Sequence, residues 1–126
     1  MSGKPKPAAV TRPLKRAEYE IAFITTSAEK GWTDALATFR NATVDAWDTL
    51  TVAPQHEDGQ RVYRLKGDLA TGTYEGMTFA RFQYKFSNGG RIWYFVDTYG
   101  KKAKAAKTAG RVLIERCATA HPNETK

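Results

Sequence analysis

The segment from Phe79 to Asp97 constrains the fold more than any other, because its pattern predicts a β-hairpin. From residue 79 to residue 86 the side chains alternate between two faces, which is typical of a strand. Residues 87–90 have the composition of a tight turn, and residues 91–97 are an aromatic and β-branched run that returns from it. We therefore expect an antiparallel strand pair with one core face and one basic face: Ala80, Phe82, Tyr84 and Phe86 share the first, and Phe79, Arg81, Gln83 and Lys85 share the second.

The rest of the chain adds two helices and three further strands to this hairpin. Ser27 is a plausible N-cap for a first helix that runs to about Phe39, and Asn41 is a plausible cap for a second helix that stops before Pro54. Short runs rich in aromatic and β-branched residues predict strands at 19–24, 61–65 and 112–118. The order β-α-α-β-β-β-β predicts an α+β fold, in which two N-terminal helices pack on one face of a twisted, antiparallel-rich sheet of four to five strands.

The chain has room for one domain. Its 126 residues fit a single modest core. Residues 1–16 combine prolines and basic residues with little apolar surface, so we expect a disordered basic arm, followed by a single domain over residues 17–126. The sequence has no secretory signal and no apolar run of about 20 residues that could cross a bilayer. Cys117 is the only cysteine, which fits a reducing compartment, and we expect a buried thiol in a cytoplasmic protein that does not contact membranes.

The net charge of +7 is concentrated in two segments. The N-terminal arm carries five basic residues and no acid, and a second acid-free stretch carries five more: Lys101, Lys102, Lys104, Lys107 and Arg111. Such clusters raise the local potential and favour phosphate backbones or an acidic partner. RNA is the polyanion that we expect.

The basic face of the predicted hairpin is the strongest candidate for a functional surface. Arg81, Gln83 and Lys85 project from alternate positions of one strand, and Arg91 lies just across the turn. Arginine offers a planar fork of donors to phosphate oxygens, whereas lysine acts as a point charge whose pKa its neighbours can lower. Around a scissile phosphate these groups would stabilise the charge of the transition state.

Several other chemistries lack a signal in the sequence. The chain has no glycine-rich phosphate loop before a helix and no cysteine or histidine pair at metal-binding spacing. It also lacks the Gly-x-Ser-x-Gly elbow of serine hydrolases. We therefore expect no metal ion and no small-molecule cofactor.

Several short motifs, in this order along the chain, resemble the RelE/ParE toxin superfamily. They are Ala28, Lys30 and Trp32 in the strand-helix-helix opening, Tyr63-Arg-Leu-Lys-Gly-Asp-Leu69, Arg81, the hairpin Gly90-Arg-Ile-Trp-Tyr94, and a last strand that closes at His121. The resemblance covers about residues 19 to 122. It implies the toxin of a type II toxin-antitoxin module, acting as a metal-independent, ribosome-dependent endoribonuclease. The implied partners are mRNA, the ribosome with its rRNA, and a cognate antitoxin protein.

The resemblance also implies roles for individual residues. Arg91 would contact the scissile phosphate, and Arg81 and Lys85 would be the basic residues of the preceding strand. Cleavage without a metal needs a base for the 2′-hydroxyl proton and an acid for the departing 5′-oxygen. His121 would be the acid, although Pro122 follows it where the family has an aromatic residue, and either Lys85 or Glu115 would be the base. The expected RNA-binding residues are Lys66, Gln83, Lys101, Lys102, Lys104, Lys107 and Arg111.

Two other functions fit the same residues. The other half of the superfamily inhibits DNA gyrase by binding it, without a ribonuclease site. A non-catalytic RNA- or DNA-binding module would use the two basic segments to neutralise phosphates, and its affinity would fall steeply with salt.

Overall fold

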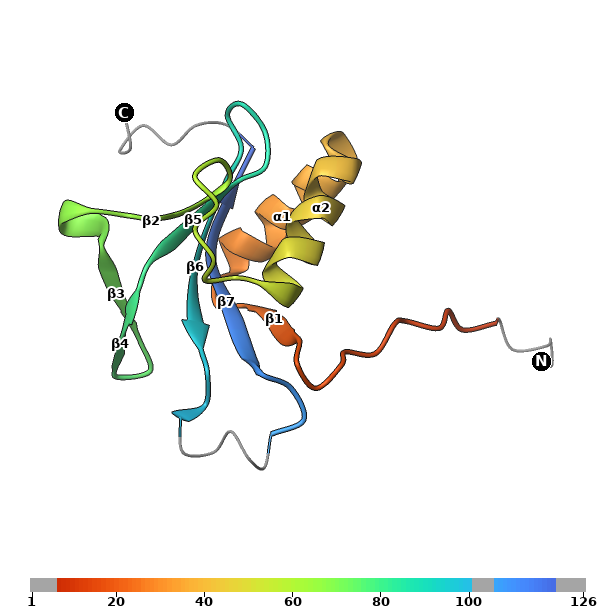
Figure 1. The fold of residues 1–126 in the computed structure, drawn as a ribbon. Coiled ribbons are helices and arrows are strands. Elements are labelled where there is room, and N and C mark those ends of the chain that lie inside the picture. The colour runs from red at the N-terminus through yellow and green to blue at the C-terminus, as the bar shows by residue number, and fades with distance from the viewer. Residues whose placement is uncertain (1–6, 101–105, 120–126) are drawn as a thin grey trace.

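A computed structural model describes residues 7–100 and 106–119, and it divides them into a helical layer and two β-layers (Figure 1). The helices are α1 (Thr26–Thr38) and α2 (Arg40–Val52), and a short 3-10 helix, η1, spans Gly67–Leu69. The strands are β1 (Tyr19–Phe23), β2 (Val62–Arg64), β3 (Thr71–Tyr74), β4 (Met77–Ala80), β5 (Phe82–Lys85), β6 (Arg91–Asp97) and β7 (Gly110–Ala118).

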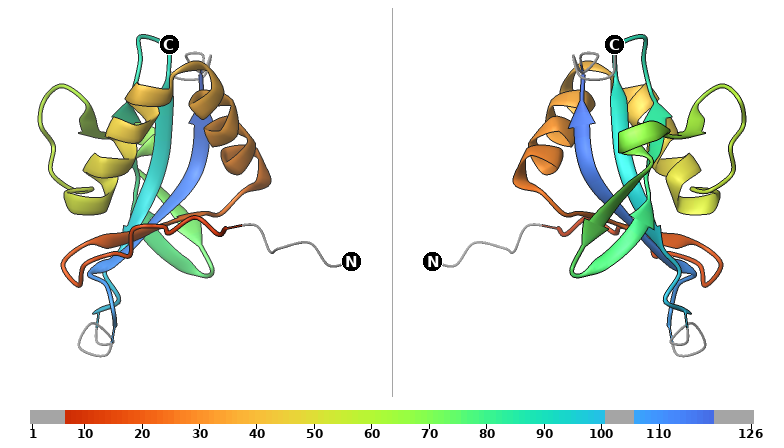
Figure 2. Two further views of the ribbon diagram at one scale, coloured as in Figure 1. Left: turned by 90° about the vertical axis from the view of Figure 1, so that its right-hand side faces the viewer. Right: turned by 90° about the vertical axis from the view of Figure 1, so that its left-hand side faces the viewer.

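Five of the strands form the main sheet, in the order β1-β7-β6-β5-β2. The β1–β7 pair is parallel and the other three pairs are antiparallel. Strands β3 and β4 form a separate hairpin (Figure 2). Both helices cover one face of the main sheet, and the hairpin lies on the other side (Figure 1). We call the first the helix-covered face and the second the open face.

The expected α+β architecture is confirmed, with two helices against a mixed, mostly antiparallel sheet. The main-sheet strands and helices follow the expected order β-α-α-β-β-β-β, and the β3–β4 hairpin is inserted between β2 and β5. The expectation of one continuous strand over residues 79–86 was wrong, since the chain leaves strand geometry at Arg81. The break occurs because Arg81 N–H donates to Ala70 O (2.9 Å) and Arg81 O accepts from Leu65 N (3.0 Å), instead of continuing one ladder.

The helix ends differ slightly from the expected caps. Thr25, rather than Ser27, is the N-cap of α1, because its hydroxyl oxygen accepts from Ala28 N at 3.0 Å. Helix α2 begins at Arg40, one residue before the expected cap at Asn41, with Phe39 as its N-cap.

The main core lies between the helices and the sheet. It is built from apolar side chains on alternate positions of the strands, among them Val62, Phe82, Tyr84, Ile92, Tyr94, Val112 and Ile114. Helix α1 approaches β7 so closely that a Cβ at Gly31 would lie 1.8 Å from the Cys117 carbonyl oxygen, so only glycine fits there. Cys117 is buried as expected, and burial raises the pKa of its thiol to about 12.

The described part of the N-terminal arm has no helix or strand, but Arg12 ties it to the domain. The Arg12 guanidinium makes two hydrogen bonds to the Glu18 carboxylate (2.6 and 2.9 Å), and it lies 5.7 Å from the centroid of the Trp47 ring. These bonds, with one from the Lys15 backbone N–H, hold the pKa of Glu18 at about 2. In the described ranges no helix is long and apolar enough to cross a bilayer.

Candidate functional site

The open face carries a row of polar and aromatic side chains that crosses four adjacent strands. Tyr63 of β2 is opposite Gln83 of β5, Gln83 is opposite Trp93 of β6, and Trp93 is opposite Arg116 of β7. Side chains at directly opposite positions of neighbouring strands point to the same side of a sheet. The topology therefore assembles this row from segments more than fifty residues apart.

Trp93 is the centre of the row and is held from several sides. Its indole N–H donates to Gln83 Oε1 at 2.8 Å, and the residue is only 5% exposed. The guanidinium carbons of Arg81 and Arg116 lie 5.7 and 5.1 Å from the ring centroid. Both distances are within the range of cation–π attraction. Gln83, an expected RNA-binding residue, thus orients Trp93.

Arg81 anchors the β3–β4 hairpin onto the open face. Its Nε and Nη2 donate to the two carboxylate oxygens of Glu115 at 2.7 and 2.9 Å, the bidentate geometry that arginine favours. Its Nη1 donates to the carbonyls of Leu69 and Thr71, which flank the start of β3. The guanidinium carbon also lies 5.5 Å from the centroid of the Phe95 ring. An expected catalytic arginine is therefore engaged in holding the second β-layer in place.

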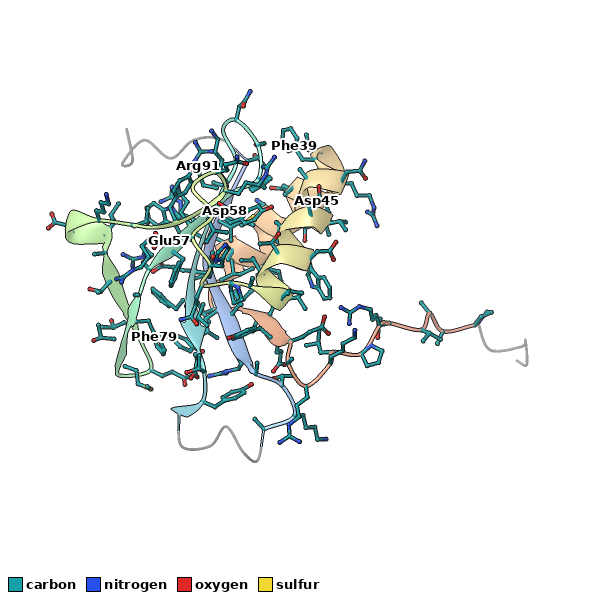
Figure 3. The ribbon with its side chains drawn as sticks, in the orientation of Figure 1. Phe39, Asp45, Glu57, Asp58, Phe79 and Arg91 are labelled. Atoms are coloured by element: carbon teal, nitrogen blue, oxygen red, sulfur yellow. The ribbon has the colours of Figure 1, made fainter. Side chains whose placement is uncertain are left out.

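The hairpin covers one half of the open face. Phe79 of β4 stacks on Phe95 of β6, with ring centroids 5.6 Å apart. Figure 3 shows Phe79 on the hairpin and Arg91 toward the other end of the sheet. The uncovered half is therefore the half that lies nearer to Arg91.

Arg91 closes the turn between β5 and β6. The Nη1 group of its 7% exposed side chain donates to the carbonyls of Ser87, Asn88 and Gly90 at 3.0–3.1 Å. The turn is also closed by Gly90 N–H, which donates to Ser87 Oγ at 2.7 Å. The guanidinium is thereby fixed at the end of the open face.

Three adjacent strands bring Lys85 and Arg91 to the end of β7. Lys85 of β5 is opposite Arg91 of β6, and Arg91 is opposite Ala118 of β7. Lys85 is half-buried, and it forms no salt bridge with any residue of the described ranges. We call Lys85, Arg91 and Ala118 the cationic end of the open face.

The remaining expected site residues lie elsewhere or outside the described ranges. Lys66 is exposed just before η1, and Lys107 is exposed before β7. Arg111 donates to Asp97 at 3.1 Å, and this hydrogen bond raises the pKa of Arg111. His121, Lys101, Lys102 and Lys104 lie outside the described residues.

Arg116 is the residue of this surface that the sequence reasoning missed. Besides contacting Trp93, it lines a shallow pocket together with Ser27, Glu115, Cys117 and Ala118. No alternation in β7 pointed to it, because Glu115 and Arg116 are adjacent and the β6–β7 register shifts at this point. Glu115, considered as a base, accepts two hydrogen bonds from Arg81.

Over residues 7–100 and 106–119, no group of three or more His, Cys, Asp or Glu side chains is arranged to hold a metal ion. No family model, curated protein or solved structure matches the chain.

Proposed function

We propose that the chain is a metal-independent endoribonuclease that binds mRNA on the uncovered half of the open face and cuts it at the cationic end. The observation that carries this proposal is the strand register that sets Lys85, Arg91 and the end of β7 side by side. Two cations on neighbouring strands suit a phosphate whose negative charge grows during cleavage. The resemblance to RelE-type toxins supports the same reaction, with the ribosome as the setting and an antitoxin as the neutralising partner.

The residues of the row beside the cationic end fit an extended RNA strand. RNA-binding sheets present aromatic rings and arginine planes to unstacked bases, and cations to the backbone. Tyr63 and Arg116 are the two ends of this row, and Gln83 and Trp93 lie between them. The row would hold the nucleotides next to the scissile bond.

The chemistry proposed for the cationic end is transesterification within the RNA. The 2′-hydroxyl oxygen attacks the adjacent phosphorus, a base takes the hydroxyl proton, and the bond to the 5′-oxygen breaks as an acid protonates that oxygen. The products are a cyclic phosphate and a free 5′-hydroxyl. We assign the base to Lys85 rather than to Glu115, because the Glu115 carboxylate already accepts two hydrogen bonds from Arg81. His121 is the proposed acid.

Arg91 would stabilise the phosphate as a fixed donor. Three turn carbonyls already accept hydrogen bonds from its Nη1, so the phosphate would be bound by the other N–H groups of the guanidinium. A fixed donor needs little reorganisation when charge develops, which is the basis of electrostatic catalysis.

The test is cleavage of mRNA in a reconstituted translation system with the new 5′ ends mapped. Wild-type protein is expected to cut inside translated codons, and Lys85→Ala and His121→Ala are each expected to slow cleavage by about 10²–10⁴-fold, the usual contribution of an acid or base. Arg40→Ala removes an exposed cation of α2, on the helical layer, and is the matched control. Intact mRNA with wild-type protein, or full activity of both site variants, would reject the proposal.

A non-catalytic RNA-binding module is the second candidate, and the engagement of the arginines favours it. Arg81 is bound by Glu115, and Arg91 is bound by its own turn. In this case RNA binding is retained and depends on salt, while no RNA is cut in the translation system.

A further inference from the structure

Two basic segments that are far apart in the sequence meet at one end of the sheet. Ala109 N–H donates to Glu18 O at 2.8 Å, and Tyr19 is opposite Gly110 in the parallel β1–β7 pair. Lys15 and Arg16 lie in the turn that precedes β1, and Lys107 lies two residues before Ala109. All three side chains are exposed.

The acidic groups at this end are partly neutralised inside the fold. Arg12 binds the Glu18 carboxylate, and Arg111 binds the Asp97 carboxylate. Glu20 is the exposed carboxylate of β1 beside them, and its opposite position in β7 is Arg111. Basic residues nevertheless outnumber the acidic ones at this end. We call the exposed side chains of Lys15, Arg16 and Lys107 the arm–loop surface.

The arm–loop surface and the cationic end lie at opposite ends of the sheet (Figure 1). Strand β7 connects them, since Gly110 pairs beside Tyr19 at its start and Ala118 is opposite Arg91 at its end. A strand of nine residues spans about 26 Å at ~3.3 Å per residue. Two cationic surfaces at this separation suit a long polyanion better than a small anion.

We infer that the arm–loop surface is a second binding site for the RNA backbone, so that one RNA strand is held at both ends of the sheet. This inference rests on the proposed RNA binding at the cationic end. A stacked strand advances about 3.4 Å per nucleotide, so about eight nucleotides are needed to reach from one surface to the other. Shorter RNA engages only one surface at a time.

The test compares single-stranded oligouridylate of four and sixteen nucleotides, with binding measured across salt concentration by fluorescence anisotropy. The variant is Lys15→Ala/Lys107→Ala, and the control is Lys30→Ala/Arg40→Ala, which removes the same charge from exposed positions of the helices. For the sixteen-mer, the loss of two phosphate contacts is expected to make the fall in affinity between 50 and 200 mM salt about sevenfold smaller. The control variant is expected to keep the wild-type slope. The four-mer engages only one surface at a time, so the variant is expected to change its affinity less than that of the sixteen-mer.

Equal salt slopes for the two double variants would overturn the inference. The inference would also be overturned if Lys15→Ala/Lys107→Ala lost binding to phosphatidylserine vesicles but bound the sixteen-mer as the wild type does, since the surface would then bind a membrane. The outcome is separable from the ribonuclease proposal. If the protein cuts no mRNA but binds the sixteen-mer and the four-mer as expected, only the ribonuclease proposal is rejected. If it cuts mRNA but the two double variants have equal salt slopes, only the second binding site is rejected.

Discussion

The two faces of the main sheet are stabilised in different ways. The helix-covered face is filled with apolar side chains, and the hydroxyl of its buried Tyr94 donates to Pro54 O at 2.7 Å. The open face is instead built around arginines, with Arg81 and Arg116 against Trp93 and Arg81 bound to Glu115. The first face depends on area removed from water, and the second depends on directed polar contacts.

This difference changes how the cations of the open face are interpreted. From sequence alone, an arginine on the surface of a sheet is a candidate for ligand binding. In Arg81, however, all three guanidinium nitrogens donate hydrogen bonds to other groups of the protein. Lys85, on the same face of the sheet, has no ion-pair partner within the described part of the chain. The contrast makes Lys85 the better catalytic candidate and Arg81 a structural one.

The largest stability effect is expected on the helix-covered face. Ile114→Ala removes a fully buried side chain from the main core and is expected to lower the free energy of unfolding by about 2–5 kcal/mol, through lost burial and the cavity it leaves. Urea denaturation measures this change. Val10→Ala, at a position 94% exposed, is the control and should stay within about 0.5 kcal/mol of the wild type. If Ile114→Ala lowered the free energy of unfolding no more than substitutions on the open face do, the proposed difference between the two faces would be rejected.

Much of the fold could be predicted from local patterns, and its main errors have a common cause. The alternation through Phe82 and Tyr84 and the turn at 87–90 were sufficient to identify the central hairpin. The β3–β4 hairpin was missed because its strands are short, carry threonine and glycine, and are stabilised by a distant ring, Phe95. The parallel pairing of β1 with β7 was also hidden, since alternation indicates a strand but not its partner.

The candidate site was less predictable than the fold. The sequence predicted that Lys85 and Arg91 would come together, because hairpin register is a local property, and the structure pairs them. It also grouped Arg81 with them, whereas Arg81 lies before β5 and anchors the β3–β4 hairpin. It could not show that Glu115, 34 residues from Arg81, would bind it, or that Arg91 would bind the carbonyls of its own turn. Such partners depend on tertiary packing.

An intermediate effect is expected at Arg81. Arg81→Ala leaves the half-buried Glu115 carboxylate and two carbonyls without their donor, which is expected to cost about 1–3 kcal/mol. Urea denaturation gives the total, and hydrogen exchange of the β3–β4 amides should accelerate, because Arg81 anchors that hairpin. Lys85→Ala removes a cation from the same face and is expected to change stability by less than about 0.5 kcal/mol. If Arg81→Ala left both readouts unchanged but abolished RNA cleavage, Arg81 would belong to the catalytic machinery instead.

The smallest effect on the free energy of unfolding is expected at Asp58, and it tests whether polar contacts also stabilise the helix-covered side. The Asp58 carboxylate accepts hydrogen bonds from the backbone N–H groups of Gln60, Arg61 and Val62 at 2.7–2.9 Å, and these bonds hold its pKa at about 2. A carboxyl with a lowered pKa stabilises the fold above its ordinary pKa of 3.8, and this contribution is lost as the pH falls toward 2. Because Asp58 is exposed, solvent screening limits the contribution to about 1 kcal/mol or less.

Asp58→Asn separates the charge from the hydrogen bonds, since the amide oxygen can still accept from the same backbone groups. The stability difference between wild type and Asp58→Asn is expected to be largest near pH 6 and to shrink between pH 4 and pH 2, as measured by urea denaturation. Asp68→Asn, which changes an exposed carboxylate of η1, is the control. A constant difference across the whole pH range would show that the start of β2 depends on hydrogen-bond geometry and not on the Asp58 charge. In that case the helix-covered side would not depend on the charge of Asp58, and charged contacts would distinguish the open face from it more clearly.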